Sequence, residues 1–247
     1  MMFLKPNSKK WVGLVCAMCL FTAIFSSCVK DRYGNSYQTY PNGNTYNGPV
    51  AYLSVIDASP DAGSLDFYLD KNQANSYAIT YGNGLAYINA YTGKRAATFY
   101  KRGTATVVKT DSITLANNGY YSLYLANLAA KPDYLFLTDT IAQPATGMAM
   151  VRFVDVSTDA PAVDLGTKGG ALITANKSYK GHSSFIALKG DSTYTFEVRP
   201  KGTSNVLVSQ SNITIRKGSI YTIWLHGLVA ATDNTRISVD IQRNAFY

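Results

Sequence analysis

The chain is poor in the residues on which most catalytic and disulfide chemistry depends. Its 247 residues include three cysteines, two histidines and one glutamate, whereas aspartate occurs fourteen times. Asp favours turns and caps while Glu favours helix interiors, so this imbalance argues against a mostly helical fold. Nineteen tyrosines favour strands instead.

All three cysteines lie near the N-terminus, at positions 16, 19 and 28. The first two fall within an uncharged run, WVGLVCAMCLFTAIF (11–25), which follows three lysines. This run is shorter than the ~20 residues that a membrane-spanning helix needs. The pattern predicts a secretory signal peptide rather than a transmembrane helix.

The stretch SSC (26–28) resembles the lipobox of bacterial lipoproteins, in which the leader is removed directly before a cysteine that is then lipidated. We therefore predict a signal peptide over 1–27 and a lipid anchor, such as palmitate, on Cys28. An ordinary secretory leader that is cut nearby is the alternative. The mature chain would keep one cysteine and no internal disulfide, so its stability would come from packed cores.

The segment after Cys28 is rich in Asn, Gly and Tyr and poor in aliphatic residues. Such a segment buries too little apolar surface to offset the entropy of ordering it, so we predict a flexible tether over 28–49. Its Lys30–Asp31 pair resembles the signal that sends Bacteroidota-type lipoproteins to the outer face of the outer membrane. We expect a protein anchored in the outer membrane and exposed at the cell surface, with the periplasmic face as the alternative.

The charge of the chain gives no sign of a nucleic-acid partner. Without residues 1–27, 20 Lys and Arg stand against 15 Asp and Glu. The basic residues are scattered, and the densest cluster consists of two Lys-Arg pairs, at 94–95 and 101–102. Nucleic-acid binding needs a basic stripe on a recognisable module, so we expect no nucleic-acid partner.

The rest of the chain is a tandem repeat. AYLSVIDASPDAGSLDF (51–67) matches AMVRFVDVSTDAPAVDL (149–165) at an offset of 98 residues. AYTGKRAATF (90–99) matches ALKGDSTYTF (187–196) at an offset of 97, and SITLANNGYYSLYLANLAA (112–130) matches NITIRKGSIYTIWLHGLVA (212–230) at an offset of 100. We therefore predict two domains, at 50–141 and 148–247.

Each repeat has the pattern of a β domain. Short runs of β-branched and aromatic residues alternate with turn residues, and TGK, NNG and KGS are turn sequences that supply positions of positive φ. Seven or eight strands in about 95 residues are typical of a sandwich with immunoglobulin-like proportions. The predicted fold is all-β, with two tandem β-sandwich domains. One larger continuous sandwich is the alternative.

The first block also points to a family. S-P-D-A-x-x-L-D (59–66), the strand that ends in Thr-Phe, and the closing G-x-Y-x-L-x-L pattern resemble the repeat of domain-of-unknown-function family 4397. The resemblance extends over nearly all of 50–247. It implies a β-rich domain of secreted bacterial proteins and lipoproteins, and no established activity. The family often has histidine where this chain has Asp57 and Asp155.

The aspartates of the first block form two matched sets, which are Asp57, Asp61 and Asp66 in one repeat and Asp155, Asp159 and Asp164 in the other. Calcium needs six to eight converging oxygens, and the spacing is not that of an EF-hand loop. Pro, Ser and Asp together favour a turn whose side chains bond to backbone N–H groups. We expect a structural turn and no metal, with a cation site as the minority hypothesis.

Catalytic motifs are not evident. His182 and His226 both lie in the second repeat and lack the partners of a triad or zinc site. Glu197 lies in the alternating strand TYTFEVRP, where we expect it to face solvent, and no pair of acids is singled out for hydrolysis. We predict a protein that is not an enzyme and has no cofactor.

Tyrosines provide the remaining candidates for binding. Tyr77, Tyr81, Tyr87 and Tyr91 flank the glycine-rich stretch YGNG (81–84). Exposed aromatic side chains stack on sugars and anchor protein interfaces, although tyrosines of strands are more often half-buried. The sequence therefore predicts a surface module for adhesion or structure, bound to the membrane by lipid and contacting a surface protein or glycan. A glycan-binding accessory lipoprotein of a nutrient-uptake system is the alternative.

Overall fold

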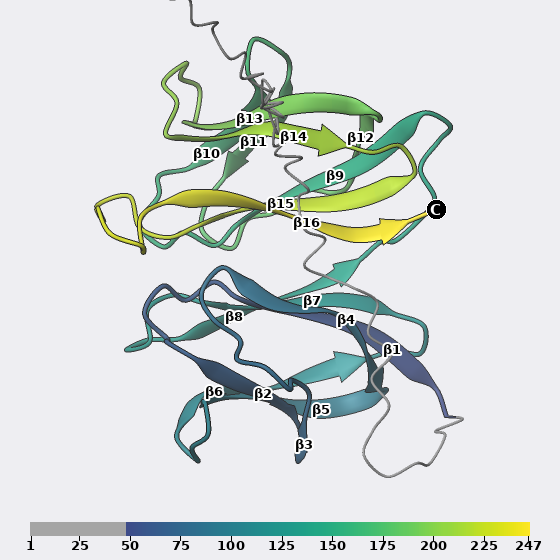
Figure 1. Ribbon diagram of the computed structural model, residues 1–247, viewed down its shortest axis with the longest axis vertical. Coiled ribbons are helices and arrows are strands. Elements are labelled where there is room, and N and C mark those ends of the chain that lie inside the picture. The colour runs from purple at the N-terminus through teal and green to yellow at the C-terminus, as the bar shows by residue number, and fades with distance from the viewer. Residues whose placement is uncertain (1–47) are drawn as a thin grey trace, which may run out of the picture. The chain divides into compact units, whose positions relative to one another are not determined.

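The computed structural model describes residues 48–247, and every regular element in this range is a β-strand (Figure 1). The first repeat contains β1 (Val50–Asp57), β2 (Leu65–Leu69), β3 (Asn72–Gln73), β4 (Asn83–Tyr91), β5 (Gly93–Lys101), β6 (Val107–Leu115), β7 (Tyr120–Ala126) and β8 (Asp133–Asp139). The second contains β9 (Met148–Asp155), β10 (Val163–Thr167), β11 (Leu172–Lys177), β12 (Ile186–Lys189), β13 (Ser192–Pro200), β14 (Val208–Ile215), β15 (Ser219–His226) and β16 (Ser238–Phe246). The predicted all-β fold is confirmed.

Each repeat folds as a sandwich of two four-stranded sheets. The central sheets have the strand orders β4-β1-β7-β8 and β12-β9-β15-β16, and the outer sheets have the orders β3-β2-β5-β6 and β11-β10-β13-β14. β1 pairs in parallel with β7, and β9 pairs in parallel with β15. The two repeats therefore share one topology, and the predicted pair of sandwiches is confirmed.

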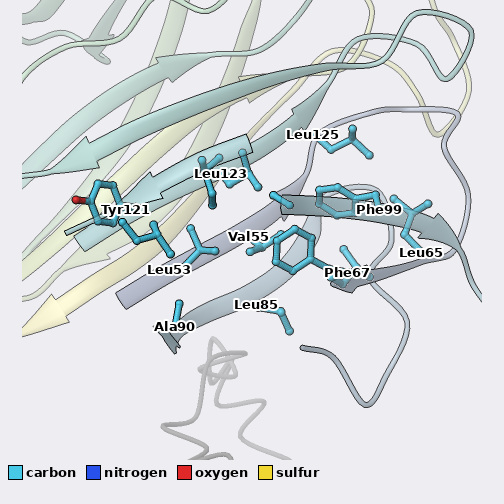
Figure 2. Close-up of a cluster of buried hydrophobic side chains, with 14 of the residues drawn as sticks. Leu53, Val55, Leu65, Phe67, Leu85, Ala90, Phe99, Tyr121, Leu123 and Leu125 are labelled. Atoms are coloured by element: carbon cyan, nitrogen blue, oxygen red, sulfur yellow. The ribbon is translucent and has the colours of Figure 1, made fainter. Parts of the chain in front are cut away.

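The core of the first sandwich lies between its central and outer sheets (Figure 2). Leu53 and Val55 of β1 and Leu123 of β7 meet Phe67 and Phe99 of the outer sheet, whose rings lie 4.9 Å apart between centroids. All five side chains are fully buried. The second core consists of Ala149, Val151, Phe153, Val163, Leu165, Phe196, Val198, Ile215, Tyr221, Ile223, Leu225 and Val239.

The strands β7 and β15, in the middle of the central sheets, are buried on both faces. Residues 121–126 of β7 and all residues of β15 are buried. A sheet that is covered on both sides needs apolar residues at nearly every position rather than at alternate ones. This is why YYSLYLANL and IYTIWLHGL are longer apolar runs than the other strand sequences.

The turns use residues with positive φ where the sequence predicts them. Gly93 of TGK has a φ of 97°, Asn118 of NNG has a φ of 57°, and Gly218 of KGS has a φ of 72°. Gly and Asn tolerate this left-handed conformation at lower cost than other residues. These three predictions are confirmed.

The pairing of β5 and β13 corrects one sequence match. Gly93 pairs with Leu115, whereas Ser192 pairs with Ile215. Since Ile215 is the counterpart of Leu115 at the offset of 100, Ser192 is the counterpart of Gly93. The offset between β5 and β13 is therefore 99 rather than the 97 read from the sequence.

Glu197 is not solvent-facing, so that expectation was wrong. Its exposed fraction is 8%. Its partner across the sheet is Gly166 of β10, and a Cβ at Gly166 would lie 3.2 Å from Nη1 of Arg199. The missing side chain leaves room for the guanidinium of Arg199, which forms an ion pair with Glu197 and covers it.

Some predictions fall outside the described residues. The signal peptide (1–27), the lipid anchor on Cys28 and nearly all of the tether (28–49) precede residue 48. Within 48–247, no helix has the length and apolar character to cross a membrane.

Candidate functional site

Asp57 and Asp155 end the first strand of their repeats and cap the turn that follows. Oδ1 of Asp57 accepts a hydrogen bond from the backbone N–H of Ser59 at 2.9 Å, and Oδ1 of Asp155 accepts one from Ser157 at 2.9 Å. Both aspartates are fully buried, and Oδ2 of each has no hydrogen-bond partner. Burial raises the pKa of Asp57 to about 8 and that of Asp155 to about 7.

Asp61 and Asp159 bond this turn to the loop that follows β7 in the first repeat and β15 in the second. Oδ1 of Asp61 accepts a hydrogen bond from the N–H of Ala129 at 2.6 Å. Asp159 accepts hydrogen bonds from the N–H groups of Val229 and Ala230, at 2.8 and 3.3 Å. The middle aspartate of each set therefore holds together two loops about 70 residues apart in the sequence.

Asp66 and Asp164 make the third contact, on the outward face of the outer sheets. Asp66 accepts a hydrogen bond from the N–H of Gly103 at 2.9 Å, and Asp164 accepts one from Gly202 at 2.9 Å. Asp66 also pairs with Arg102 at 2.9 Å. These bonds fix the turn between β5 and β6 in the first repeat and the turn between β13 and β14 in the second.

The six aspartates thus bond to three different parts of each repeat instead of converging. Among residues 48–247, no group of three or more His, Cys, Asp or Glu side chains could hold a metal ion. Matched hydrogen bonds in both repeats show that this stretch forms a turn twice. The cation site remains the minority hypothesis that titration with Ca²⁺ would test.

The four candidate tyrosines do not gather at one place. Tyr77 is exposed, with 52% of its surface accessible, and the guanidinium of Arg95 lies 5.9 Å from the ring centroid of Tyr91. Tyr81 and Tyr87 instead make hydrogen bonds to residues of the second repeat. The structure therefore divides the candidates between the surface and the contact between repeats.

A buried ion pair lies at this contact between the two central sheets. Arg152 of β9 pairs with Asp139 of β8, and the exposed fractions of the two side chains are 3% and 0%. Nε of Arg152 donates a hydrogen bond to Oγ1 of Thr222 at 2.9 Å, and Nη2 donates one to Oγ of Ser122 at 3.0 Å. The guanidinium is therefore satisfied by both repeats, as a buried charge requires.

Further hydrogen bonds extend this network. The hydroxyl of Tyr87 donates to Oδ2 of Asp139 at 2.5 Å and accepts a hydrogen bond from the amide of Asn244 at 3.1 Å. Burial and the neighbouring carboxylate raise the pKa of the Tyr87 hydroxyl, which keeps its proton in place. The amide of Gln242 donates to Oγ of Ser54 at 2.9 Å.

An apolar cluster and a second polar chain complete the contact between repeats. The cluster contains Ile56, Ala58, Tyr124, Ala126, Leu135 and Leu137 of the first repeat and Val154, Val156 and Trp224 of the second. The hydroxyl of Tyr81 lies 2.8 Å from Nδ1 of His226, whose Nε2 lies 3.1 Å from Asp240. The imidazole, which is 3% exposed, also stacks on Trp224 with centroids 4.1 Å apart.

The polar residues of this contact were not singled out by the sequence, apart from Tyr81, Tyr87 and His226. One signal was present: Arg152 is the only charged residue of β9 before its final Asp155, and it stands where the first repeat has Ser54. A lone arginine within an apolar strand requires a buried partner. That partner, Asp139, lies in the other repeat.

The first repeat matches a known protein family. The family model described as "Domain of unknown function (DUF4397)" matches residues 51–166. This confirms the family resemblance over the first repeat and the first two strands of the second. No curated protein matches the chain.

A solved structure is also similar to the chain. It is a family 26 carbohydrate-binding module of the Eubacterium rectale protein Amy13K, determined in complex with maltoheptaose. The sequence identity is 10% and the TM-score is 0.24. The match covers 78% of this chain and 97% of that module.

Proposed function

We propose that this chain, whose residues 51–166 match the DUF4397 family model, is a lipid-anchored protein of the cell envelope that works by binding or structural presentation. In this proposal it is not an enzyme. Its two sandwiches form one surface module, held away from the membrane by the segment 28–49. In this proposal, the module adheres to a surface protein or a glycan.

The observation that carries the proposal is the buried contact between the two repeats. Arg152 and Asp139 are both almost wholly buried, and their ion pair is completed by hydroxyls from each repeat. Removing either partner would leave a buried charge without its counter-ion, at a cost of about 3–5 kcal/mol. Such a contact joins the repeats into one unit, which suits a module that presents a surface.

Anchoring supports the cell-envelope part of the proposal. The run of uncharged residues and the SSC stretch resemble the leader and lipobox of a lipoprotein, in which Cys28 would carry the acyl chains. No other cysteine would remain in the mature chain. Cys28 is therefore the residue to change first.

Metabolic labelling tests this proposal in a bacterium that processes lipoproteins. The wild-type chain should incorporate alkynyl palmitate, and protease added to intact cells should remove its folded part. Cys28→Ala should lose the label, while Cys19→Ala, a change within the leader, should keep it. The proposal fails if Cys28→Ala is still labelled or if the protein is digested only after the outer membrane is opened.

A second candidate function is glycan capture for nutrient uptake. It is favoured by one specific feature, the pair of tyrosines on the outward face of the first outer sheet, Tyr68 and Tyr100. Aromatic rings beside hydroxyl groups are suited to sugars, whose rings have apolar faces and hydroxyl edges. A glycan array with the full chain would favour this candidate if specific hits appear.

A further inference from the structure

Two tyrosines lie side by side on the outward face of the first outer sheet. Phe67 of β2 and Phe99 of β5 point into the core and are fully buried. Side chains alternate along a strand, so Tyr68 and Tyr100 lie on the opposite face. Their rings are 5.1 Å apart between centroids and nearly perpendicular, at 78°.

Hydroxyl groups continue this face across the sheet. Thr98 is the cross-strand partner of both Tyr68 and Thr110, and the two threonine hydroxyls lie 2.8 Å apart. Val107, the partner of Tyr100, is 49% exposed. We call these residues together with Ser112 the Tyr68 face: Tyr68, Thr98, Tyr100, Val107, Thr110 and Ser112.

No residue of the Tyr68 face is charged, although an ion pair borders it beside Tyr100. Asp66, the cross-strand partner of Tyr100, is 7% exposed and forms an ion pair with Arg102, whose side chain is 38% exposed. Because these two charges already pair with each other, neither is left over to attract an anionic or cationic partner. An uncharged partner that offers both apolar patches and hydroxyls fits it.

The second repeat builds the same sheet without this face. Gly166 occupies the position of Tyr68, and its cross-strand partner Glu197 occupies that of Thr98. Arg199 occupies the position of Tyr100 and pairs with Glu197. The sheet can thus form without the two tyrosines, so the fold alone does not account for them.

We infer that the Tyr68 face is a binding site for a neutral polysaccharide. The tyrosine rings stack on the apolar face of a sugar, and the exposed hydroxyls of Thr110 and Ser112 bond to its hydroxyl groups. Because the two rings are perpendicular, one of them contacts a sugar by its face and the other by its edge. The inference rests on the proposed function, since it identifies the surface by which the module binds.

Native gel electrophoresis with polysaccharide in the gel tests this site. The full chain is run in detergent through gels that contain xyloglucan, galactomannan, amylopectin or the anionic polygalacturonate. At least one neutral polymer should retard the wild-type chain, and polygalacturonate should not. Tyr68→Ala/Tyr100→Ala should weaken binding roughly tenfold or more, as expected when central aromatic contacts are lost, without changing mobility in a plain gel.

Control variants separate this site from the other tyrosines. Tyr77→Ala removes an exposed tyrosine outside the face and should leave the retardation unchanged, and Tyr68→Phe/Tyr100→Phe should keep most of it because the rings remain. Thr110→Asp adds a charge at an exposed position and should abolish the retardation even if the alanine variant does not fold.

Several results would overturn the inference. These are no retardation of the wild-type chain by any neutral polymer, retardation by polygalacturonate alone, or retardation that the Tyr68 and Thr110 variants leave intact. A change of oligomeric state in these variants without polysaccharide binding would assign the face to contact between copies instead. Labelling of Cys28 and protease exposure do not depend on this face, so they test the proposed function separately.

Discussion

Asp57 and Asp155 combine a turn with a buried carboxyl group. One oxygen of each accepts the N–H of a serine two residues later, and the other oxygen has no partner. An ionised carboxylate in this position has lost its water without full compensation, so the neutral form is favoured. The raised pKa values of these two groups are the result.

Stability should therefore fall as the pH rises through this range. The folded chain holds a proton on Asp57 up to pH about 8, whereas the ordinary pKa of 3.8 governs the unfolded chain. Unfolding then releases protons above pH about 4, so the free energy of unfolding decreases as pH increases. We expect a lower free energy of unfolding, and so a lower melting temperature, at pH 9 than at pH 5. Asp57→Asn should remove roughly 4 kcal/mol of the difference in free energy, since each pH unit between 5 and about 8 contributes about 1.4 kcal/mol.

Asp61→Asn is the matched control for this experiment. Asp61 is exposed, and an amide oxygen can still accept the N–H of Ala129 as the carboxylate does. Its melting profile between pH 5 and pH 9 should follow that of the wild-type chain. An Asp57→Asn profile as steep as that of the wild type would show that this carboxyl does not cause the pH dependence.

Predictions from the sequence succeeded at this scale where the partners are local. Asp57 and Asp155 form the predicted turn because each bonds to a serine only two residues along the chain. Tyr81 and Tyr87 were different, since their partners His226 and Asn244 lie 145 and 157 residues away. A side chain that looks exposed in its own repeat can be buried by the other, and nothing in the local pattern reveals this.

At the scale of elements, the sequence predicted strands well and their registers less well. The sequence match aligned residues 93–99 with 190–196, at an offset of 97, whereas the strand pairing aligns β5 with β13 at an offset of 99. A shift of two residues in a strand leaves every side chain on its original face. The alternation of apolar residues therefore could not detect the error, and only hydrogen-bonded partners on both neighbouring strands corrected it.

Gly84 provides a test of the pairing between β1 and β4. The register of this pair shifts between Leu53 and Val55, and a Cβ at Gly84 would lie 1.9 Å from the carbonyl oxygen of Val55. Backbone must move to admit any side chain there. Gly84→Ala should lower the free energy of unfolding by about 3 kcal/mol or more, a loss in the range of overpacking, as measured by denaturant titration.

Gly103→Ala is the control for this substitution. Gly103 has a φ of 68°, and a Cβ added to it would have no atom within 4 Å, so the change tests backbone conformation without a clash. It should cost about 1–2 kcal/mol, the penalty for a left-handed residue with a side chain. Equal costs for the two variants would contradict the close approach of β4 to β1.

At the scale of the whole described chain, the repeats are joined by charge and hydrogen bonding as well as by apolar packing. The long apolar strands β7 and β15 indicated burial on both faces, but not what would cover the second face. Arg152 was the clearest signal of a polar contact, and its partner Asp139 could not be identified without the structure. The division into two sandwiches was therefore predictable, whereas the contact between them was not.

Arg152→Leu isolates the contribution of this contact. It should lower the free energy of unfolding by about 3–5 kcal/mol because the carboxylate of Asp139 would stay buried without its cation. Arg152→Leu/Asp139→Leu should recover much of that loss, since no charge then remains buried. Lys217→Leu, which breaks an ion pair whose side chains are 67% and 54% exposed, should cost only a small fraction of that loss.

Calorimetric unfolding of the full chain and of Arg152→Leu tests the central claim, that the two repeats act as one unit. We predict a single transition for the wild-type chain, with equal calorimetric and van't Hoff enthalpies. In Arg152→Leu the whole transition should move to lower temperature, or divide in two if the contact is lost. Two separate transitions in the wild-type chain, with Arg152→Leu shifting only the one that belongs to the second repeat, would contradict the account.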